Sequence, residues 1–439
     1  MAERRPIALT LYRVLGRALT PLLHLLFRRR AANGKEIESR KGERFGVTGV
    51  PRPEGSLVWI HAASVGETMS VLPLIEQLAR DGHSVLLTSV TVTAAELAEK
   101  RLPKNCIHQF TPYDTPECVS SFLDHWRPDL AMVVESEIWP CMFDEVHQRG
   151  IPFALLNGRM SESSSRNWMK APKTSGYIFK CLDLVLAQSD ADKERFFKLG
   201  CRHVEMPGNL KFDAAEPAAD EEDRRRLADQ IGDRPVWMAA LTHPGEDEIA
   251  LKAHARLLEE HPDLLLLLVP RHPARADDVA ALVRDRGHVL ARRSCGDPVA
   301  AETGVYLGDT LGEMGLFYRL APVTFLGGSF NDAGGHNPVE AVLLGSALVT
   351  GPKVANARAV YKDLWGQGAA LKAAEPAQLS LEIARLIDRP ESRKEQVDRA
   401  MKRVIEGRGA LTRTAALLKP ILARKSQADT MERGDGQGA

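Results

Sequence analysis

Short runs of apolar residues alternate with longer stretches of helical periodicity along most of the chain. In the first half these runs are LVWIHA (57–62), SVLLTSV (84–90), CIHQFTP (106–112), LAMVVES (130–136), PFALLNG (152–158) and LVLAQS (184–189). In the second half they are VWMAAL (236–241), LLLLLVP (264–270), GVYLG (304–308), VTFLGG (323–328) and ALVTG (347–351). Because buried strands that alternate with helices form parallel sheets covered on both faces, the pattern predicts an α/β fold in two halves.

An interruption separates the two halves at residues 211–225, where alanine, proline and acidic residues outnumber core-forming residues. We interpret this stretch as a linker. The sequence then predicts a helical segment over residues 1–35, one domain over 36–212 and a second over 213–424. Residues 425–439 are polar, and we expect them to form a disordered tail.

The segment Ile7–Phe27 predicts an amphipathic helix. Arg13, Arg17 and His24 fall in one sector of a helical wheel. The opposite sector holds Leu11, Val14, Leu15, Ala18, Leu22 and Leu25. Because two arginines at bilayer depth are unfavourable, we expect a helix that lies in the headgroup interface, with the arginines at 28–30 as anchors. A single membrane span is a minor variant, and an ordinary helix packed on the protein body is the alternative.

Composition excludes several classes of protein. The chain has 439 residues, with 58 Lys+Arg against 58 Asp+Glu, so its net charge of zero provides no general attraction to nucleic acid. The six cysteines form no C-x-x-C pair, which argues against a zinc site or a disulfide framework. The sequence also lacks G-x-x-x-x-G-K-[ST], H-E-x-x-H, G-x-S-x-G and a dinucleotide-binding G-x-G-x-x-G, so P-loop, zincin, hydrolase and dehydrogenase functions are not expected.

In parallel sheets, ligands bind at the carboxyl ends of the strands, so residues just after each apolar run are the candidates for function. The first candidate is IHAASVGE (60–67), in which Ser64, Gly66 and Glu67 follow a strand and enter a helix. Glu67 is a candidate general base. The alternatives are that its carboxylate only complements the helix dipole and that Ser64 is only an N-cap.

A second acidic motif, VVESEIWP (133–140), places Glu135 and Glu137 at a strand end. Residues two apart in an extended segment point the same way, so we expect both carboxylates on one side. Glu137 is the possible second acid, although helix capping and pairing with arginine are equally good explanations. Arg159 and Lys211, in NGRMS and GNLKFD, are further candidates for contact with an anionic ligand.

The second half holds three motifs that suit a nucleotide. Arg271 and His272 follow a strand, where a guanidinium binds phosphate oxygens in bidentate fashion. The segments GDTLGEM (308–314) and FLGGSFNDAGGHNPVEA (325–341) combine glycine turns with helix starts, whose N–H groups bind phosphate. The candidate residues in them are Leu311, Gly312, Glu313, Gly334, Gly335, His336, Asn337, Pro338, Val339 and Glu340. Glu340 is suited to accept hydrogen bonds from ribose hydroxyls.

Eight motifs, taken in order, resemble those of the 3-deoxy-D-manno-octulosonic acid (Kdo) transferases. They are HAASVGE (61–67), SEIWP (136–140), NGRMS (157–161), GNLKFD (208–213), THPGE (242–246), PRHP (270–273), GDTLGEM (308–314) and GGHNPVEA (334–341). The resemblance implies a GT-B glycosyltransferase, with two Rossmann-like domains that face a central cleft. It implies CMP-Kdo as the donor and a lipid A precursor as the acceptor, at the cytoplasmic face of the inner membrane.

The resemblance also implies roles for individual residues. Glu67 takes the role of general base, and Arg271, His272, residues 311–313 and residues 337–340 take the role of CMP binding. The expected reaction inverts the anomeric configuration and needs no metal or other cofactor. The alternatives are a nucleotide-sugar 2-epimerase, which shares the two-lobed fold, and a non-catalytic nucleotide-binding protein at the membrane.

Overall fold

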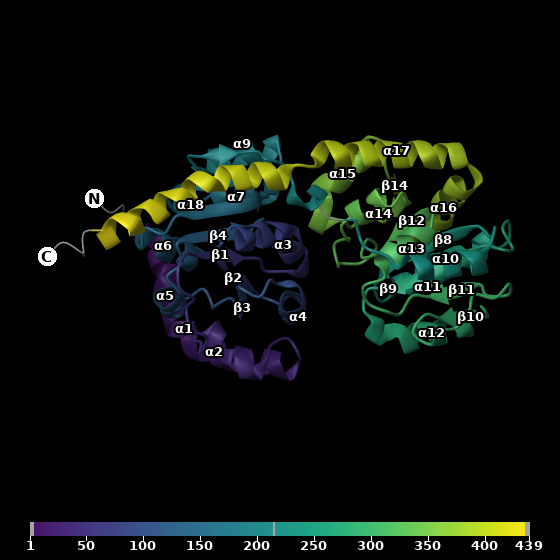
Figure 1. Ribbon diagram of the computed structural model, residues 1–439, viewed down its shortest axis with the longest axis horizontal. Helices are drawn as coiled ribbons and strands as arrows, with labels where there is room; N and C mark the ends of the chain where they lie inside the picture. The colour runs from purple at the N-terminus through teal and green to yellow at the C-terminus, as the bar shows by residue number, and fades with distance from the viewer. Residues whose placement is uncertain (1–3, 214–215, 435–439) are drawn as a thin grey trace. The chain divides into compact units, whose positions relative to one another are not determined.

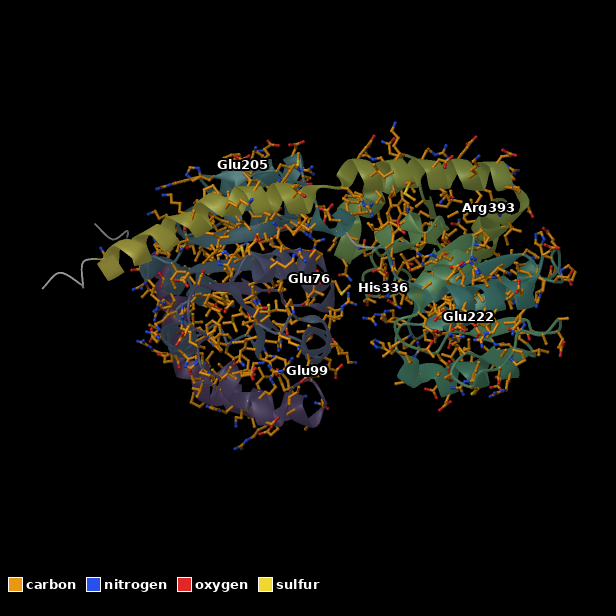
Figure 2. All side chains as sticks on the ribbon, in the orientation of Figure 1. Glu76, Glu99, Glu205, Glu222, His336 and Arg393 are labelled. Atoms are coloured by element: carbon orange, nitrogen blue, oxygen red, sulfur yellow. The ribbon has the colours of Figure 1, made fainter. Side chains whose placement is uncertain are left out.

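The computed structural model describes residues 4–213 and 216–434, in which the chain forms two compact α/β units (Figure 1). The first unit comprises residues 1–213 and 408–439, and the second comprises residues 214–407. Side chains fill the space between each sheet and its helices (Figure 2). Each unit is a Rossmann-like α/β layer structure, as expected for the GT-B class.

The first unit is built on a seven-stranded parallel sheet with the order β3-β2-β1-β4-β5-β6-β7. The strands are β1 (Leu57–His61), β2 (Ser84–Ser89), β3 (Cys106–Phe110), β4 (Leu130–Val134), β5 (Phe153–Gly158), β6 (Leu184–Ala187) and β7 (Val204–Glu205). All six apolar runs of the first half form strands. The two-residue edge strand β7 carries no apolar run of its own, so the sequence pattern missed it.

Helices cover both faces of this sheet and bury its side chains in two hydrophobic clusters. These helices are α3 (Val65–Arg80), α4 (Val92–Arg101), α5 (Pro116–Trp126), α6 (Pro140–Gln148), α7 (Glu162–Met169), α8 (Pro172–Lys180) and α9 (Asp190–Leu199). Strands β1 and β4 are buried along their whole length, which is why they appear as unbroken apolar runs.

The second unit repeats this plan with the parallel strand order β10-β11-β9-β8-β12-β13-β14. Its strands are β8 (Val236–Thr242), β9 (Leu265–Pro270), β10 (Leu290–Arg292), β11 (Val305–Leu307), β12 (Val323–Leu326), β13 (Ala347–Thr350) and β14 (Leu371–Lys372). Its helices are α10 (Glu221–Ile231), α11 (Glu246–Leu257), α12 (Ala276–Asp285), α13 (Met314–Leu320), α14 (Val339–Leu343), α15 (Arg358–Gly366), α16 (Leu379–Asp388) and α17 (Pro390–Gly407). The expected linker is shorter than 211–225, because α10 already begins at Glu221.

The C-terminal helix α18 (Ala410–Gly434) differs from the sequence expectation, because it belongs to the first unit. Ala410, Ala415 and Leu418 lie in the hydrophobic cluster of the first sheet. Asp213 accepts hydrogen bonds from the backbone N–H groups of Gly409 and Leu411, each at 2.6 Å. Residues 408–424 were expected in the second domain, since helical periodicity alone does not show which sheet a helix covers.

The expected disordered tail also begins later than the sequence indicated. Helix α18 continues to Gly434, so residues 425–434 are helical. Residues 435–439 lie outside the described part of the chain.

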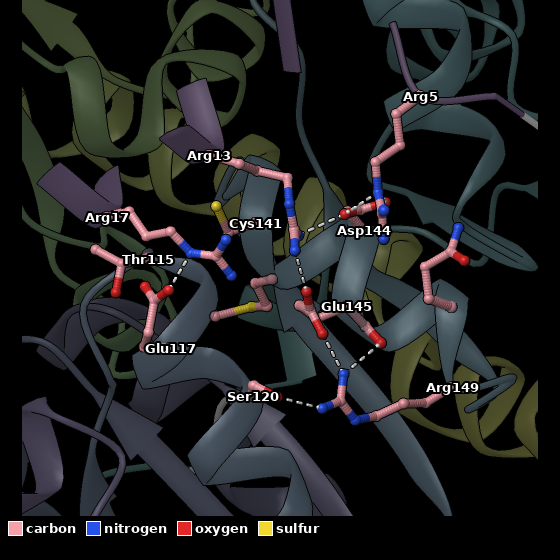
Figure 3. Close-up of polar contacts among 12 residues, drawn as sticks. Arg5, Arg13, Arg17, Thr115, Glu117, Ser120, Cys141, Asp144, Glu145 and Arg149 are labelled. Carbon is pink, nitrogen blue, oxygen red and sulfur yellow. Dashed lines mark hydrogen bonds and ion pairs between the residues drawn. The ribbon is translucent and has the colours of Figure 1, made fainter. Parts of the chain in front are cut away.

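The N-terminal helix α1 (Ile7–Ala32) faces the protein with its charged sector (Figure 3). Arg13 donates to the buried Asp144 at 2.5 Å and to Glu145 at 2.6 Å. Arg5, just before the helix, donates through Nε to both oxygens of Asp144, at 3.0 and 2.9 Å. These carboxylates lie on α6, so ion pairs attach α1 to the body of the first unit.

The other polar residues of this sector also contact the body. Arg17 pairs with Glu117 on α5 (Figure 3), and the ring of His24 stacks on Phe45 with centroids 3.9 Å apart. Phe45 follows the short helix α2 (Lys41–Arg44). The helix thus packs on the protein, as the alternative interpretation held, and it does so through these polar residues together with the buried Leu9 and Phe27.

The apolar sector of α1 is consequently exposed. Among the large apolar residues of α1, those with the largest exposed fractions, 45% to 81%, are Ile7, Leu11, Val14, Leu15, Leu19, Leu22, Leu25 and Leu26. Arg28 and Arg29 are exposed beside them, whereas Arg30, expected as a third anchor, pairs with Glu36 at 2.9 Å. Within the described residues, no helix has the length and apolarity that a membrane span requires.

Candidate active site

Glu67 lies in the first turn of α3, just beyond the carboxyl end of β1. Ser64 is the N-cap, and its hydroxyl accepts the N–H of Glu67 at 3.3 Å. The carboxylate bends back over this turn: Oε2 accepts the N–H of Ala63 at 2.8 Å, and Oε1 accepts the hydroxyl of Ser64 at 3.1 Å. This is half of a capping box, because the carboxylate accepts the N–H of Ala63 and not that of the N-cap residue itself; the two bonds fix the orientation of the acid. Gly66 is exposed and is not near a close backbone contact.

Glu135 and Glu137 follow β4, the neighbour of β1, and both carboxylates act on Glu67. We expected the two carboxylates on one side because we expected residues 135–137 to be extended. That reason was wrong, because the chain turns after β4. Glu135 has a φ of 58° in a turn. The carboxyl ends of adjacent parallel strands nevertheless bring the three acids to one edge of the sheet, as the strand positions predicted.

The acids have different protonation behaviour. Burial, together with the negative charges of Glu137 and Glu135, raises the pKa of Glu67 to about 8. Burial also favours neutral Glu137, but contacts with His61 and Trp139 outweigh it and hold the pKa of Glu137 below its usual value. Acids whose environments separate their pKa values can take different chemical roles: Glu137 is ionised at neutral pH, whereas Glu67 gives up its proton only near pH 8.

Glu137 contacts two side chains, Trp139 and His61, to which the sequence analysis assigned no role. The indole Nε1–H of Trp139 donates to Oε2 of Glu137 at 2.8 Å. Nε2 of His61 lies 3.8 Å from the same oxygen, which is an electrostatic contact and not a hydrogen bond. The ring of His61 is fully buried, and its Nδ1 contacts the hydroxyl of Thr111 at 2.8 Å. The sequence feature that could have pointed to His61 is its place as the last residue of a buried apolar strand.

Lys211 joins this group from a distant part of the sequence. Its ammonium pairs with Glu135, and both side chains are largely buried. The preceding residue is held by Asn157, whose Oδ1 accepts the N–H of Leu210 at 3.0 Å. The NGRMS and GNLKFD motifs therefore meet. The backbone N–H of Arg159 binds the carbonyl of Glu135 at 3.1 Å, which places Arg159 at the same edge.

The second unit brings imidazoles and a guanidinium together at the ends of β8 and β9. His336 stacks on His243 with centroids 5.2 Å apart, and their Nε2 atoms are 3.1 Å apart. His272 contacts His243 edge to face at 5.9 Å. Burial, together with His243 and Arg271, lowers the pKa of His336 to about 3. Burial also lowers the pKa of His272, as does the charge of Arg271. The imidazoles are therefore neutral at pH 7 and Arg271 supplies the positive charge.

The glycine-rich loop before α14 is as constrained as its sequence suggested. Gly334 and Gly335 have φ values of 83° and 76°, which other residues rarely adopt. A Cβ on Gly335 would lie 3.2 Å from Val354. Asn337 accepts the N–H of Val339 at 3.3 Å, so its side chain caps the following helix. Residues 337–340 thus form a helix start, with Pro338 at the N-cap position and Glu340 half-buried in the first turn.

In the turn at 311–313, the side chain of Glu313 is bound by other residues of the protein. Arg293 binds both oxygens of Glu313, at 3.0 and 2.5 Å, and the hydroxyl of Thr310 also bonds to it. These contacts hold the pKa of Glu313 below its usual value. Leu311 is 71% exposed and Gly312 has a φ of 86°, so the tip of the turn remains accessible.

One group outside these sites has the geometry of metal ligands. Glu260, His261 and Asp388 each offer one ligand atom, and these atoms lie within 4.8 Å of one another. Both carboxylates are exposed, as acidic surface groups often are without a metal. Within the described part of the chain, the acids around Glu67 are not among such groups; Glu135 pairs with Lys211, and Glu137 accepts the indole N–H of Trp139.

Comparison with known proteins gives one consistent result. The model of the family described as 3-deoxy-D-manno-octulosonic-acid transferase (kdotransferase) matches residues 39–214. The 3-deoxy-D-manno-octulosonic acid transferase of Haemophilus influenzae is 35% identical over 396 residues, which cover 88% of this chain and 92% of the relative. That of Bordetella pertussis is 35% identical over 427 residues, which cover 94% of this chain and 99% of the relative.

A solved structure described as an S. aureus MnaA–UDP co-structure matches with a TM-score of 0.59, over 84% of this chain and 97% of that one. At 14% identity it supports the fold alone. The relatives decide the family. The chain belongs to the 3-deoxy-D-manno-octulosonic acid transferases, and it is a glycosyltransferase of lipopolysaccharide core biosynthesis.

Proposed function

We propose that this chain transfers Kdo from CMP-Kdo to a lipid A precursor, lipid IVA, with Glu67 as the general base. One observation carries the assignment of the base. Glu67 has a pKa of about 8, and both of its oxygens are held in place by Ala63 and Ser64. A base is most effective when its pKa lies near the working pH.

The reaction is a direct displacement. Glu67 takes the proton of an acceptor hydroxyl as that oxygen attacks the anomeric carbon of Kdo. CMP leaves from the opposite face of the sugar, so the anomeric configuration inverts. Lys211 keeps Glu135 paired, while Glu137 remains charged beside Trp139 and raises the basicity of Glu67.

The second unit is suited to the donor. Arg271 is the charged group beside three neutral imidazoles, and a guanidinium binds phosphate oxygens in bidentate fashion. The helix start at 337–340 and the turn at 311–313 offer backbone N–H groups, and Glu340 is the acceptor for ribose hydroxyls. Ser64, Gly66, Arg159, Gly334, Gly335 and His336 remain candidates for further ligand contacts.

We expect the reaction to need no divalent ion or other cofactor. The leaving group carries one phosphate, and preorganised donors at Arg271 and the helix start can stabilise its charge. Activity should be unchanged after dialysis against EDTA. Loss of activity that Mg²⁺ restores would contradict this expectation.

The outward apolar sector of α1 favours contact with a lipid surface. An amphipathic helix normally directs its polar side to water, but here the polar side is engaged with α5 and α6, and the leucines are exposed. Arg28 and Arg29, exposed beside the leucines, suit anionic headgroups. We therefore place the protein at the cytoplasmic face of the inner membrane, with α1 lying on the bilayer.

The membrane contact is tested by sedimentation with anionic vesicles. Leu15→Glu and Leu22→Glu together should abolish co-sedimentation, because they place two charges on the outward sector. Leu381→Glu, on an exposed leucine of the second unit, is the matched control and should bind as the wild type does. Equal binding by all three proteins would contradict the assignment of α1.

The reaction is tested by incubating the purified protein with CMP-Kdo and lipid IVA and weighing the products. The expected result is a lipid heavier by one or more Kdo residues, with CMP released only when acceptor is present. The alternative function, a nucleotide-sugar 2-epimerase, shares the fold of the structural neighbours and requires no acceptor. Conversion of a nucleotide sugar incubated alone with the protein would favour the epimerase and overturn the transferase.

A further inference from the structure

A pocket of about 180 Å³ lies in the first unit beside the C-terminal end of α1. It is lined by Leu26, Arg30, Glu36, Arg44, Val90, Thr111, Pro112, Tyr113 and Trp139. Val90 follows β2 and Thr111 follows β3, so the pocket lies at the carboxyl edge of the sheet, as the acids around Glu67 do. It is larger than the roughly 150 Å³ that an apolar cavity needs to hold benzene.

The charged groups of this pocket satisfy one another. Glu36 accepts Arg30 through one oxygen and Arg44 through the other, each at 2.9 Å. Arg44 also donates to the carbonyls of Thr111, at 3.1 Å, and Val90, at 2.5 Å. These contacts therefore hold the charged side chains of the pocket wall in place, and they are satisfied without a ligand. The hydroxyl of Thr111 contacts Nδ1 of His61 at 2.8 Å, and the remaining lining is apolar or aromatic, which suits a hydrocarbon ligand.

One polar group of the pocket lacks a partner within the described residues. The hydroxyl of Tyr113 is buried and makes no hydrogen bond there, while its ring packs edge to face on Phe45 at 5.4 Å. A buried hydroxyl without a partner is unfavourable, because it has lost its hydrogen bond to water. An oxygen on a bound ligand would relieve this cost by accepting its hydrogen bond.

The pocket connects two surfaces that the proposed reaction uses. Leu26 is 45% exposed and belongs to the outward apolar sector of α1. Trp139, which also lines the pocket, donates to Glu137, whose charge acts on Glu67. A lipid whose chain enters beside Leu26 therefore brings its sugar toward the acids at the end of β1 and β4.

We propose that this pocket binds one acyl chain of the acceptor lipid, with the carbonyl oxygen of that chain accepting the hydroxyl of Tyr113. The inference rests on the proposed function and adds the feature by which the acceptor is selected. About six carbons of the chain fit the volume, by comparison with benzene. Acyl-chain binding positions the acceptor, so it acts on acceptor KM and not on the chemical step.

The experiment compares lipid IVA with its deacylated form, which keeps the same sugars and phosphates. Val90→Phe fills the pocket and should raise the KM for lipid IVA about tenfold or more, without changing kcat or the KM for CMP-Kdo. The KM for the deacylated acceptor should stay at its wild-type value. Val50→Phe, on an exposed valine of the same unit outside the pocket, is the matched control and should leave all constants unchanged.

Tyr113→Phe is the second variant, because it removes one oxygen and leaves the packing intact. It should raise the KM for lipid IVA about 2- to 10-fold, the range that one hydrogen bond gives. Equal effects on both acceptors, or no effect of Val90→Phe on lipid IVA, would overturn the pocket assignment. A wild-type protein that modifies neither acceptor would instead overturn the proposed function, so the two failures are distinguishable.

Discussion

The two units place a glutamate at the same point of their folds, and the two carboxylates differ in what surrounds them. Glu67 follows β1 in the first turn of α3, and Glu246 follows β8 in the first turn of α11. Glu246 is 1% exposed and accepts four backbone N–H groups, from His243, Gly328, Ser329 and Phe330, at 2.7 to 3.0 Å. Glu67 accepts one N–H and one hydroxyl.

The difference shows that position in the fold does not decide the role of an acid. Four N–H donors satisfy Glu246, and those at 328–330 tie the end of β12 to the end of β8. Glu67 has fewer donors to offset its burial, and with the charges of its two acidic neighbours this burial raises its pKa to about 8. One carboxylate is therefore a structural acceptor and the other is available for proton transfer.

Glu67→Gln should have the largest effect. The amide keeps the shape but cannot take a proton, so kcat should fall about 10²- to 10⁴-fold while the melting temperature stays near the wild-type value. Glu76→Gln, on an exposed residue of the same helix (Figure 2), is the control and should retain full activity. Near-normal turnover by Glu67→Gln would move the base elsewhere, with Glu137 as the next candidate.

Glu246→Gln should lower stability instead. The amide nitrogen would face N–H donors in place of an accepting oxygen, so the free energy of unfolding should fall by about 3 kcal/mol in urea titration. The folded fraction should keep its activity. Glu259→Gln is exposed and should change stability by less than about 0.5 kcal/mol. If Glu246→Gln unfolds at the wild-type urea concentration, the two glutamates differ less than the hydrogen bonds indicate.

Glu137→Gln tests the electrostatic part of the comparison through the pH profile. In the wild type, kcat/KM should rise with pH through a midpoint near 8, where Glu67 loses its proton. Removing the negative charge of Glu137 makes Glu67 easier to ionise, so the midpoint should move to lower pH. Glu99→Gln, at an exposed site of the same unit, should leave the midpoint in place. A shift to higher pH would contradict the assigned cause.

Ser64→Ala should give the smallest effect. Loss of the N-cap should lower the free energy of unfolding by about 1 kcal/mol. The hydroxyl of Ser64 also stabilises charged Glu67, so the midpoint of the pH profile should move slightly upward. Thr91→Ala removes the equivalent N-cap of α4, whose hydroxyl accepts Ala94 N–H at 3.2 Å. It should match the stability loss without moving the midpoint.

Much of this arrangement follows from local sequence. Buried parallel strands are unbroken apolar runs, and their carboxyl ends place Glu67 and Glu137 at one edge of the sheet. The pairing of β1 with β4, which makes the two acids neighbours, was not predicted. The roles of His61, Asn157 and Glu246 depended on partners far away in the sequence, such as Leu210 for Asn157 and residues 328–330 for Glu246. Sequence periodicity carries no information on such pairings, and for the same reason it did not show which side of α1 faces the protein.

The path of the chain through the first sheet has a consequence for dissecting the protein. The polypeptide leaves the first unit after residue 213 and re-enters it at residue 408, so the second unit is an insertion with both of its ends internal. Residues 214–407, a single contiguous fragment, contain the second unit and are the natural choice for isolated expression. A fragment that ends at residue 213 would instead lack Ala410, Ala415 and Leu418. These side chains pack in the hydrophobic cluster of the first unit that includes Val58 and Ile60 of β1, so this cluster would lose part of its cover.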